Sequence, residues 1–103
     1  MNSYVVNLYP VPNDGFPGET LLVNNAQAYQ FTQQIDYKTT CCYITAVGGN
    51  FYVTFDGSTP SVNNGHEFQV PFAGWWSKEA TRVAKMITTG GHTSRVTFSQ
   101  FTY

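Results

Sequence analysis

The sequence predicts an all-β protein: an antiparallel β-sandwich, of jelly-roll or immunoglobulin-like type, with seven to nine short strands and an irregular N-terminal arm. Segments in which apolar and polar residues alternate recur along the 103 residues. Turn residues separate these segments roughly every ten positions, and no segment shows a convincing helical period. Because each sheet must bury one face, we expect the strands to stack in two layers.

We expect one domain, residues 19–103, preceded by an arm at residues 1–18, since the chain is long enough for a single core only. Residues 4–10 are apolar enough for a strand, which Pro10 and Pro12 would end or confine to an edge. Three Pro and two Gly between positions 10 and 18 predict irregular backbone. In an oligomer such an arm could lie on a neighbouring copy.

Two short strands are predicted next, at residues 20–23 and 26–31, separated by the turn dipeptide Asn24-Asn25. A helix over residues 21–31 is the alternative, because Ala and Gln favour it. The polar segment that follows, to residue 40, is expected to be a loop or an edge strand.

A hairpin is predicted between residues 41 and 55. A β-rich run at 41–47 is followed by Gly48-Gly49-Asn50, which can adopt the positive φ of a tight turn, and the chain returns at 51–55.

The returning strand alternates cleanly between its two sides. Phe51, Val53 and Phe55 share one side, while Tyr52 and Thr54 share the other. This is the pattern of a half-buried strand.

Asp56-Gly57 is predicted to reverse the chain, since Gly tolerates positive φ and Asp can accept a hydrogen bond from the backbone two residues on. Residues 57–65 then read as an exposed loop. His66 directly follows Gly65 and begins an alternating strand, so we expect its side chain to satisfy a local backbone group.

The C-terminal part is predicted to be a hairpin of strands 80–87 and 93–101, joined near Gly90-Gly91. Helix propensity in the first of these strands is the competing signal, but its β-branched residues fit a strand. The residues expected on one face of the last strand are Val96, Phe98 and Gln100.

The composition is rich in aromatic residues and poor in charge. Aromatic residues make up 17% of the chain and charged residues 11%, with a net charge of -1. About a third of the positions are Ser, Thr, Asn or Gln. Because free cytosolic proteins rely on net charge to stay soluble, this favours a protein embedded in an assembly or working outside cells over a β domain that is simply low in charge.

The charge pattern predicts no nucleic-acid partner, because the five cations are scattered and offset by acids and form no basic stripe. These cations are Lys38, Lys78, Arg82, Lys85 and Arg95. No run reaches the roughly 18 apolar residues of a membrane span, and the N-terminus lacks a signal-peptide pattern. We expect no membrane association and a chain made and folded in a cytoplasm.

The sequence predicts no catalytic, cofactor or metal site. His66 and His92 are the only histidines, and neither belongs to a metal-binding pattern. Asp56 could pair with His66 and Ser58, but its position before Gly57 favours a turn role. We therefore expect a protein without enzymatic activity.

Cys41 and Cys42 are adjacent, so on a strand their side chains point to opposite faces and cannot form a disulfide without distortion. We expect one buried thiol and one neutral filler; a vicinal disulfide or a metal pair is the alternative. Gly48-Gly49, like Gly90-Gly91, precedes no helix and is interpreted as a turn and not as a phosphate cradle.

Trp75-Trp76 is the candidate binding feature. On a strand one indole would face the core and the other the solvent, where it could anchor a protein interface or stack on a sugar ring. Tyr52 and Tyr43 could extend such a surface. A wholly structural role for the pair is the remaining alternative.

The segment YVTFDGSTPS at residues 52–61, followed by Asn64-Gly65-His66, resembles a recurrent pattern of small tailed-bacteriophage proteins. In that pattern a strand leads into DGxxPS or DGxxPT, here with Pro60, then a short spacer, GH and another strand. The Gly-Gly turn and the terminal aromatic strand are similar too, so the resemblance covers residues 41–103. It marks a turn of the fold and carries no active site.

The resemblance implies a virion structural protein of β-sandwich type, assembled in the host cytoplasm. Among virion roles we expect a capsid decoration or cement protein, a homo-oligomer that binds the major capsid protein. The alternatives are a neck or tail component, or a carbohydrate-binding module that takes a glycan.

Overall fold

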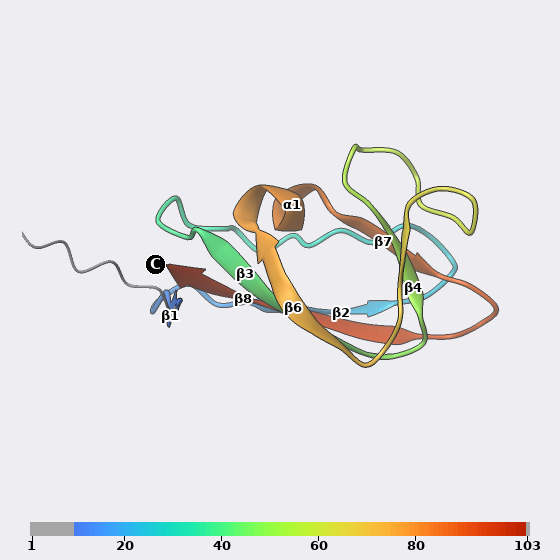
Figure 1. The fold of residues 1–103 in the computed structure, drawn as a ribbon, viewed down its shortest axis with the longest axis horizontal. Coiled ribbons are helices and arrows are strands. Elements are labelled where there is room, and N and C mark those ends of the chain that lie inside the picture. Colours follow the sequence, from blue (N-terminus) through green and yellow to red (C-terminus); the bar gives the residue numbers. More distant parts are fainter. Residues whose placement is uncertain (1–9, 103) are drawn as a thin grey trace, which may run out of the picture.

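The computed structural model describes residues 10–102, which form two antiparallel β-sheets and one short helix (Figure 1). Eight strands lie in this part of the chain. The elements are β1 (Val11–Pro12), β2 (Glu19–Val23), β3 (Cys41–Gly48), β4 (Phe51–Thr54), β5 (His66–Phe68), β6 (Phe72–Ser77), α1 (Lys78–Val83), β7 (Lys85–Thr88) and β8 (Ser94–Thr102). The predicted all-β sandwich class is confirmed.

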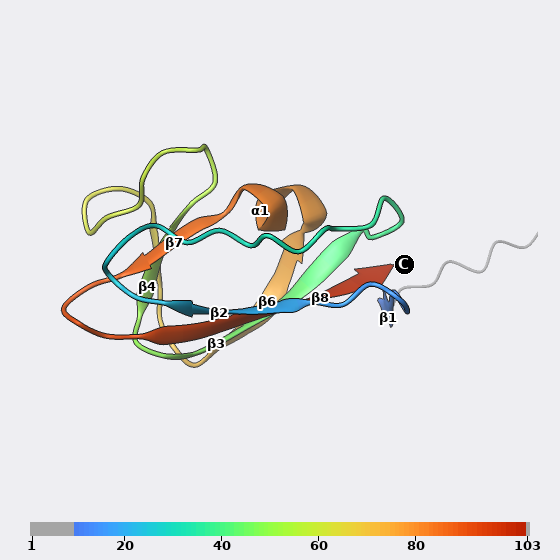
Figure 2. The ribbon, with the colours of Figure 1, turned by 180° about the vertical axis from the view of Figure 1, so that it is seen from behind.

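The larger sheet has five strands in the order β1-β8-β3-β6, with β2 also paired to β8. Strand β8 is its centre, because β3 pairs along one side and β1 and β2 pair along the other. The smaller sheet has three strands in the order β5-β4-β7. Figures 1 and 2 show the smaller sheet and α1 on the same side of the larger sheet.

The core lies between the two sheets. Ile44 of β3 and Phe98 of β8 are fully buried, as are Phe51 and Val53 of β4. Where the smaller sheet does not reach, residues 31–39 and α1 cover the same face of the larger sheet. The rings of Phe31 and Phe98, for example, lie with 4.6 Å between their centroids. The inner faces predicted from alternation are therefore buried.

Both predicted hairpins are wrong in their pairing, although their strands exist. β3 belongs to the larger sheet and β4 to the smaller one. Likewise, β8 belongs to the larger sheet and β7 to the smaller one. The two Gly-Gly segments carry the chain from one layer to the other. The first of them contacts the residues that follow the second, since the Gly49 amide donates to the Thr93 carbonyl at 2.9 Å. Paired in one sheet, the apolar faces of β3 and β4 would lie side by side; in two layers they bury each other.

The predicted strand at 80–87 is also wrong in its first half, which is helix α1. Ser77 caps the helix by accepting a hydrogen bond from the Ala80 amide at 3.1 Å. Glu79 lies in the first turn and Arg82 in the last, which suits the helix dipole. The cap and these charges outweigh the β-branched residues until the chain enters β7.

The predicted strand at 26–31 reduces to a single bridge between Tyr29 and Met86, and no helix forms there. The turn at Asn24 is confirmed, because its side chain accepts a hydrogen bond from the Ala26 amide at 2.8 Å. Residues 33–40 form a loop without strand structure, one of the two predicted alternatives.

The described part of the N-terminal arm packs against the larger sheet of the same chain. β1 pairs with the end of β8, and the Asn13 amide donates to the Gln100 carbonyl at 2.9 Å. The prediction of irregular backbone throughout 10–18 is therefore wrong, because β8 offers β1 a free edge. The strand predicted at 4–10 lies, except for Pro10, outside the described residues.

The buried side chain of Gln100 ties three segments together. Its Oε1 accepts from the Asp36 amide and the Thr39 hydroxyl, while its Nε2 donates to the carbonyls of Pro17 and Gln34, at 2.8 to 3.0 Å. Because all these hydrogen bonds are made, burying the Gln100 carboxamide costs little free energy, and the bonds fix how the three segments are placed. The network holds the arm and the 33–40 loop against β8.

Candidate functional site

The outer face of the larger sheet is the candidate site. Figures 1 and 2 show no element of the described residues 10–102 over this face. Trp75 and Trp76 are neighbours on β6, yet Trp75 is 47% exposed and Trp76 only 8%. The predicted division of the pair, one indole in the core and one in solvent, is confirmed.

Trp75 belongs to a cluster of three aromatic residues, which we call the aromatic cluster: Tyr43, Trp75 and Phe101. Tyr43 lies directly opposite Trp75 in the sheet, with 4.9 Å between ring centroids. Phe101 of β8 meets Trp75 at 5.0 Å and at an interplanar angle of 80°. The ring planes lie at steep angles to one another, so the three rings form an uneven protrusion and not one flat surface.

Hydroxyl groups surround the aromatic cluster. The Ser and Thr residues on the outward side of the strands are Thr20, Thr45, Ser77, Thr97 and Ser99. Thr20 and Thr97 share a hydrogen bond of 2.8 Å across β2 and β8. Among the described strand residues whose pairing places them on the side of Tyr43 and Trp75, Arg95 is the one charged residue, so the face can lose water at low electrostatic cost.

Tyr52 does not extend this surface, contrary to the prediction. It lies on β4 of the other sheet, opposite Glu67 of β5. There it lines a hollow of about 360 Å³ together with His92 and the turn at Gly48-Gly49. The sequence placed Tyr52 opposite the inward aromatic residues of its own strand, which is correct, but did not show that β4 is in a different layer from β3 and β6.

The loop between β4 and β5 holds its polar side chains together. Asp56 Oδ1 accepts from the amide and the hydroxyl of Ser58, and Asn64 Nδ2 donates to Ser58 Oγ at 3.0 Å. The hydroxyl of Thr54 donates to the Ser58 carbonyl. The hydrogen bonds from the Ser58 hydroxyl and, second, from the Ser58 amide lower the pKa of the Asp56 carboxyl.

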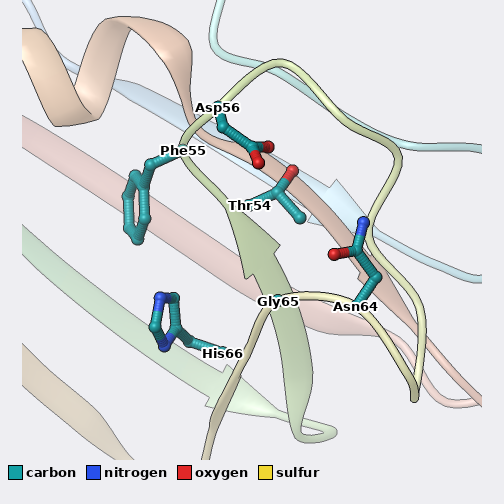
Figure 3. A pocket seen from close by; sticks show the side chains of 6 residues that line it. All are labelled: Thr54, Phe55, Asp56, Asn64, Gly65 and His66. Carbon is teal, nitrogen blue, oxygen red and sulfur yellow. The ribbon is translucent and has the colours of Figure 1, made fainter.

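The same loop encloses an open hollow of about 370 Å³ (Figure 3). Figure 3 shows Asp56 and Asn64 on the loop side, and the rings of Phe55 and His66 on the other side. His66 lies near Phe55, with 6.0 Å between ring centroids. Asp56 hydrogen-bonds to Ser58, whereas the His66 ring lies beside Phe55. Within residues 10–102 no hydrogen bond joins the His66 side chain to Asp56, to Ser58 or to a local backbone group.

The turn residues of the loop have the predicted structural roles. Gly57 adopts φ +87°, and Pro60 is fully buried beneath the loop. Gly65 adopts φ +110°, and a Cβ there would lie 2.5 Å from the Val53 carbonyl oxygen. Gly90 and Gly91 also have positive φ, although they connect two layers and not a hairpin.

Cys41 and Cys42 are neighbours on β3. Both thiols are free and both are buried, so the expected buried thiol is present and the neighbouring cysteine is buried as well. Burial raises the pKa of the Cys42 thiol, which keeps it protonated at neutral pH. Among residues 10–102, no cluster of three His, Cys, Asp or Glu side chains could hold a metal ion. No helix in that range has the length and apolar character needed to cross a bilayer.

Phe101 is the site residue that sequence analysis missed. Its place on the outward side of the last strand was predictable from the alternation of residues 93–101. Its contact with Trp75 was not, because it depends on β3 pairing with both β8 and β6. Sequence alternation gives the side of a strand but not its neighbours.

The fold and the site define an all-β protein with an uncovered aromatic sheet face. No protein-family profile matches the chain, and neither a curated protein nor a solved structure shows significant similarity to it.

Proposed function

We propose that the protein is a non-enzymatic virion structural protein, a capsid decoration or cement protein that docks on the major capsid shell through the outer face of its larger sheet. The observation that carries the proposal is the exposed aromatic cluster around Trp75 on a nearly uncharged face.

The chemistry of the face suits a protein partner. Trp and Tyr are the residues that most often dominate binding energy, because they bury a large area with few rotatable bonds. Here Trp75 is braced by Tyr43 and Phe101 on paired strands, so little conformational freedom is lost on docking. The hydroxyl groups around the cluster can hydrogen-bond to backbone or side chains at the rim of an interface.

Binding that exists only on the assembled shell would stabilise the shell. A ligand that binds one state and not another shifts the equilibrium towards the bound state by mass action. A decoration protein that bridges neighbouring capsid subunits therefore raises the free energy needed to separate them.

The resemblance of residues 52–66 to small tailed-phage proteins supports a virion location. In this chain the pattern has a structural reason, since Asp56, Pro60 and Gly65 hold the loop between β4 and β5. The composition, rich in aromatic and hydroxyl side chains, is a second and independent support for a protein that works within an assembly.

A neck or tail component is the alternative within the same class, and a glycan-binding module is the alternative outside it. The steep angles within the aromatic cluster do not favour the flat stacking of a sugar ring. Tyr52, beside Glu67 and His92, is a separate aromatic position where a glycan could bind.

Copy number per particle tests the proposal. Phage particles should be purified from cells that carry the gene for this chain, and the chain quantified by mass spectrometry against the major capsid protein. A decoration protein is expected in hundreds of copies. About a dozen copies would favour a neck or tail role, and absence from particles would refute a virion role.

A variant then tests the docking face. Trp75→Ala should weaken the binding of added protein to particles that lack it by at least tenfold, which corresponds to about 1.4 kcal/mol. Tyr37→Ala is the matched control, because Tyr37 is also an exposed aromatic residue, at 78%, but lies on the 33–40 loop. Equal binding by wild type and Trp75→Ala would contradict docking through this face, as would binding of both to host-surface glycans but not to shells.

A further inference from the structure

We propose that β6 is a self-pairing edge: two copies of the chain join β6 to β6, antiparallel about a two-fold axis, so that their larger sheets become one continuous sheet. This proposal goes beyond docking on a shell, since it concerns the edge of the sheet and not its outer face.

Strand β6 ends the larger sheet. It pairs only with β3, and among the described residues 10–102 no backbone hydrogen bond joins Phe72–Ser77 to another strand or loop on its other side. In an antiparallel pair, about half of the backbone N–H and C=O groups of an edge strand point away from its partner. Those groups of β6 are open to a further strand.

The other edges of the described sheets carry features that hinder pairing. β1 is two residues long and contains Pro12, which has no N–H. β5 is three residues long and carries the exposed Glu67. Short length, Pro and charge are the devices by which natural sheets avoid edge-to-edge association.

The remaining two edges are partly covered by their own chain. β7 begins with Lys85, and Tyr29 exchanges two backbone hydrogen bonds with Met86 of that strand, at 2.7 and 2.8 Å. β2 begins with Glu19, whose carboxylate accepts from the Thr32 and Gln33 amides and holds that segment beside the strand. By contrast, β6 reads Phe-Ala-Gly-Trp-Trp-Ser, with six residues, no charge and no Pro.

The sequence of β6 suits pairing with β6 of a second copy of the chain. In a two-fold antiparallel pair each residue meets a residue of the same strand. Because β6 carries no charge, this pairing brings no like charges together. With the axis at Gly74, Trp75 of one copy lies opposite Ala73 of the other, on the outward side. The large indole then meets a methyl group. The absent side chain of Gly74 leaves room for the Phe72 ring of its own chain, whose Cζ would lie 2.9 Å from an added Cβ.

The pairing is expected to be weak and reversible. A six-residue edge buries less surface than the roughly 1,200 Å² of a typical stable complex, so we expect association in the micromolar range. Pairing would also place the two aromatic clusters on the same side of the joined sheet.

The test is sedimentation velocity of the full chain from about 1 to 200 μM, a range that brackets such an affinity. Wild type should pass from monomer to dimer. Ala73→Lys places a charge on an exposed position of the edge and should weaken dimerisation at least tenfold, with an unchanged near-UV circular dichroism spectrum. Leu22→Lys is the matched control on the opposite edge strand, where Leu22 is 63% exposed, and should dimerise like wild type.

A monomer throughout the concentration range would overturn the proposal, as would loss of the dimer in Leu22→Lys but not in Ala73→Lys. Hydrogen exchange on wild type gives a test that needs no variant. Amide exchange within Phe72–Ser77 should slow at least threefold between dilute and concentrated samples, while β5 should not change. Equal exchange in β6 at both concentrations would also refute the pairing.

Discussion

The loop between β4 and β5 and the outer face of the larger sheet contain the two most distinctive parts of the sequence, and they use their side chains in opposite ways. In the loop, the Ser58 hydroxyl donates to Asp56 and accepts from Asn64. On the outer face, Trp75 projects into solvent. Polar side chains that hydrogen-bond within their own loop stabilise structure, whereas an apolar group left in water is available for binding.

The two tryptophans should differ most in their effect on stability. Trp76→Ala should lower the free energy of unfolding by about 4 kcal/mol, because it leaves a cavity where the indole contacts Phe55 and Phe68 at 5.2 and 5.5 Å. Urea denaturation followed by far-UV circular dichroism measures the change.

Trp75→Ala is the control for that experiment and should cost about 1 kcal/mol or less, since the side chain is half exposed and loses mainly its contacts with two neighbouring rings. Similar losses for both variants would show that Trp75 is part of the fold and would weaken its assignment to docking.

The second prediction tests the loop. Gly65→Ala should lower the free energy of unfolding by roughly 3 kcal/mol, because an L residue is strained at φ +110° and the new Cβ would meet the Val53 carbonyl oxygen. Gly91→Ala is the matched control: φ is +76° but no atom lies within 4 Å of the added Cβ, so a loss of about 1 kcal/mol is expected. Equal effects would mean that the close approach of Gly65 to β4 does not matter.

The third and smallest effect concerns pH. Because the native pKa of Asp56 lies below its ordinary value of 3.8, the ionised carboxylate stabilises the folded state above that pH. The contribution is lost as pH falls through the lowered native pKa. Asp56→Asn should therefore be less stable than wild type at pH 7, and the difference should shrink at pH 3, as measured by urea denaturation at both pH values. A difference independent of pH would indicate that charge plays no part in the Ser58 contact.

Local structure was predictable wherever a single strand or turn decides it. Alternation placed Phe51, Val53 and Phe98 on buried faces, and the turn chemistry of Asp56-Gly57 was correct. Helix α1 was missed because its Ser77 cap and its charges compete with β-branched residues of similar propensity. The strand at 26–31 was overestimated for a related reason, because its partner Met86 lies far away in the sequence.

The candidate site was predictable only in part. The sequence separated Trp75 from Trp76 and placed Tyr43 on the outward side of its strand. It grouped Tyr52 with them and left out Phe101, because it treated each Gly-Gly segment as a hairpin turn. A glycine pair permits a sharp change of direction but does not specify whether the chain returns beside itself or crosses to another layer.

By itself, the sequence determined the class of the fold, the inward and outward sides of the main strands, the turn at Asp56-Gly57 and the low charge of the surface. Each of these depends on residues that are neighbours along the chain. Tertiary structure alone decided which strands share a sheet, and with that the aromatic cluster, the burial of Gln100 and the open edge at β6. The physical reason is that pairing and layering are chosen by the mutual burial of faces contributed by distant segments, which no local pattern contains.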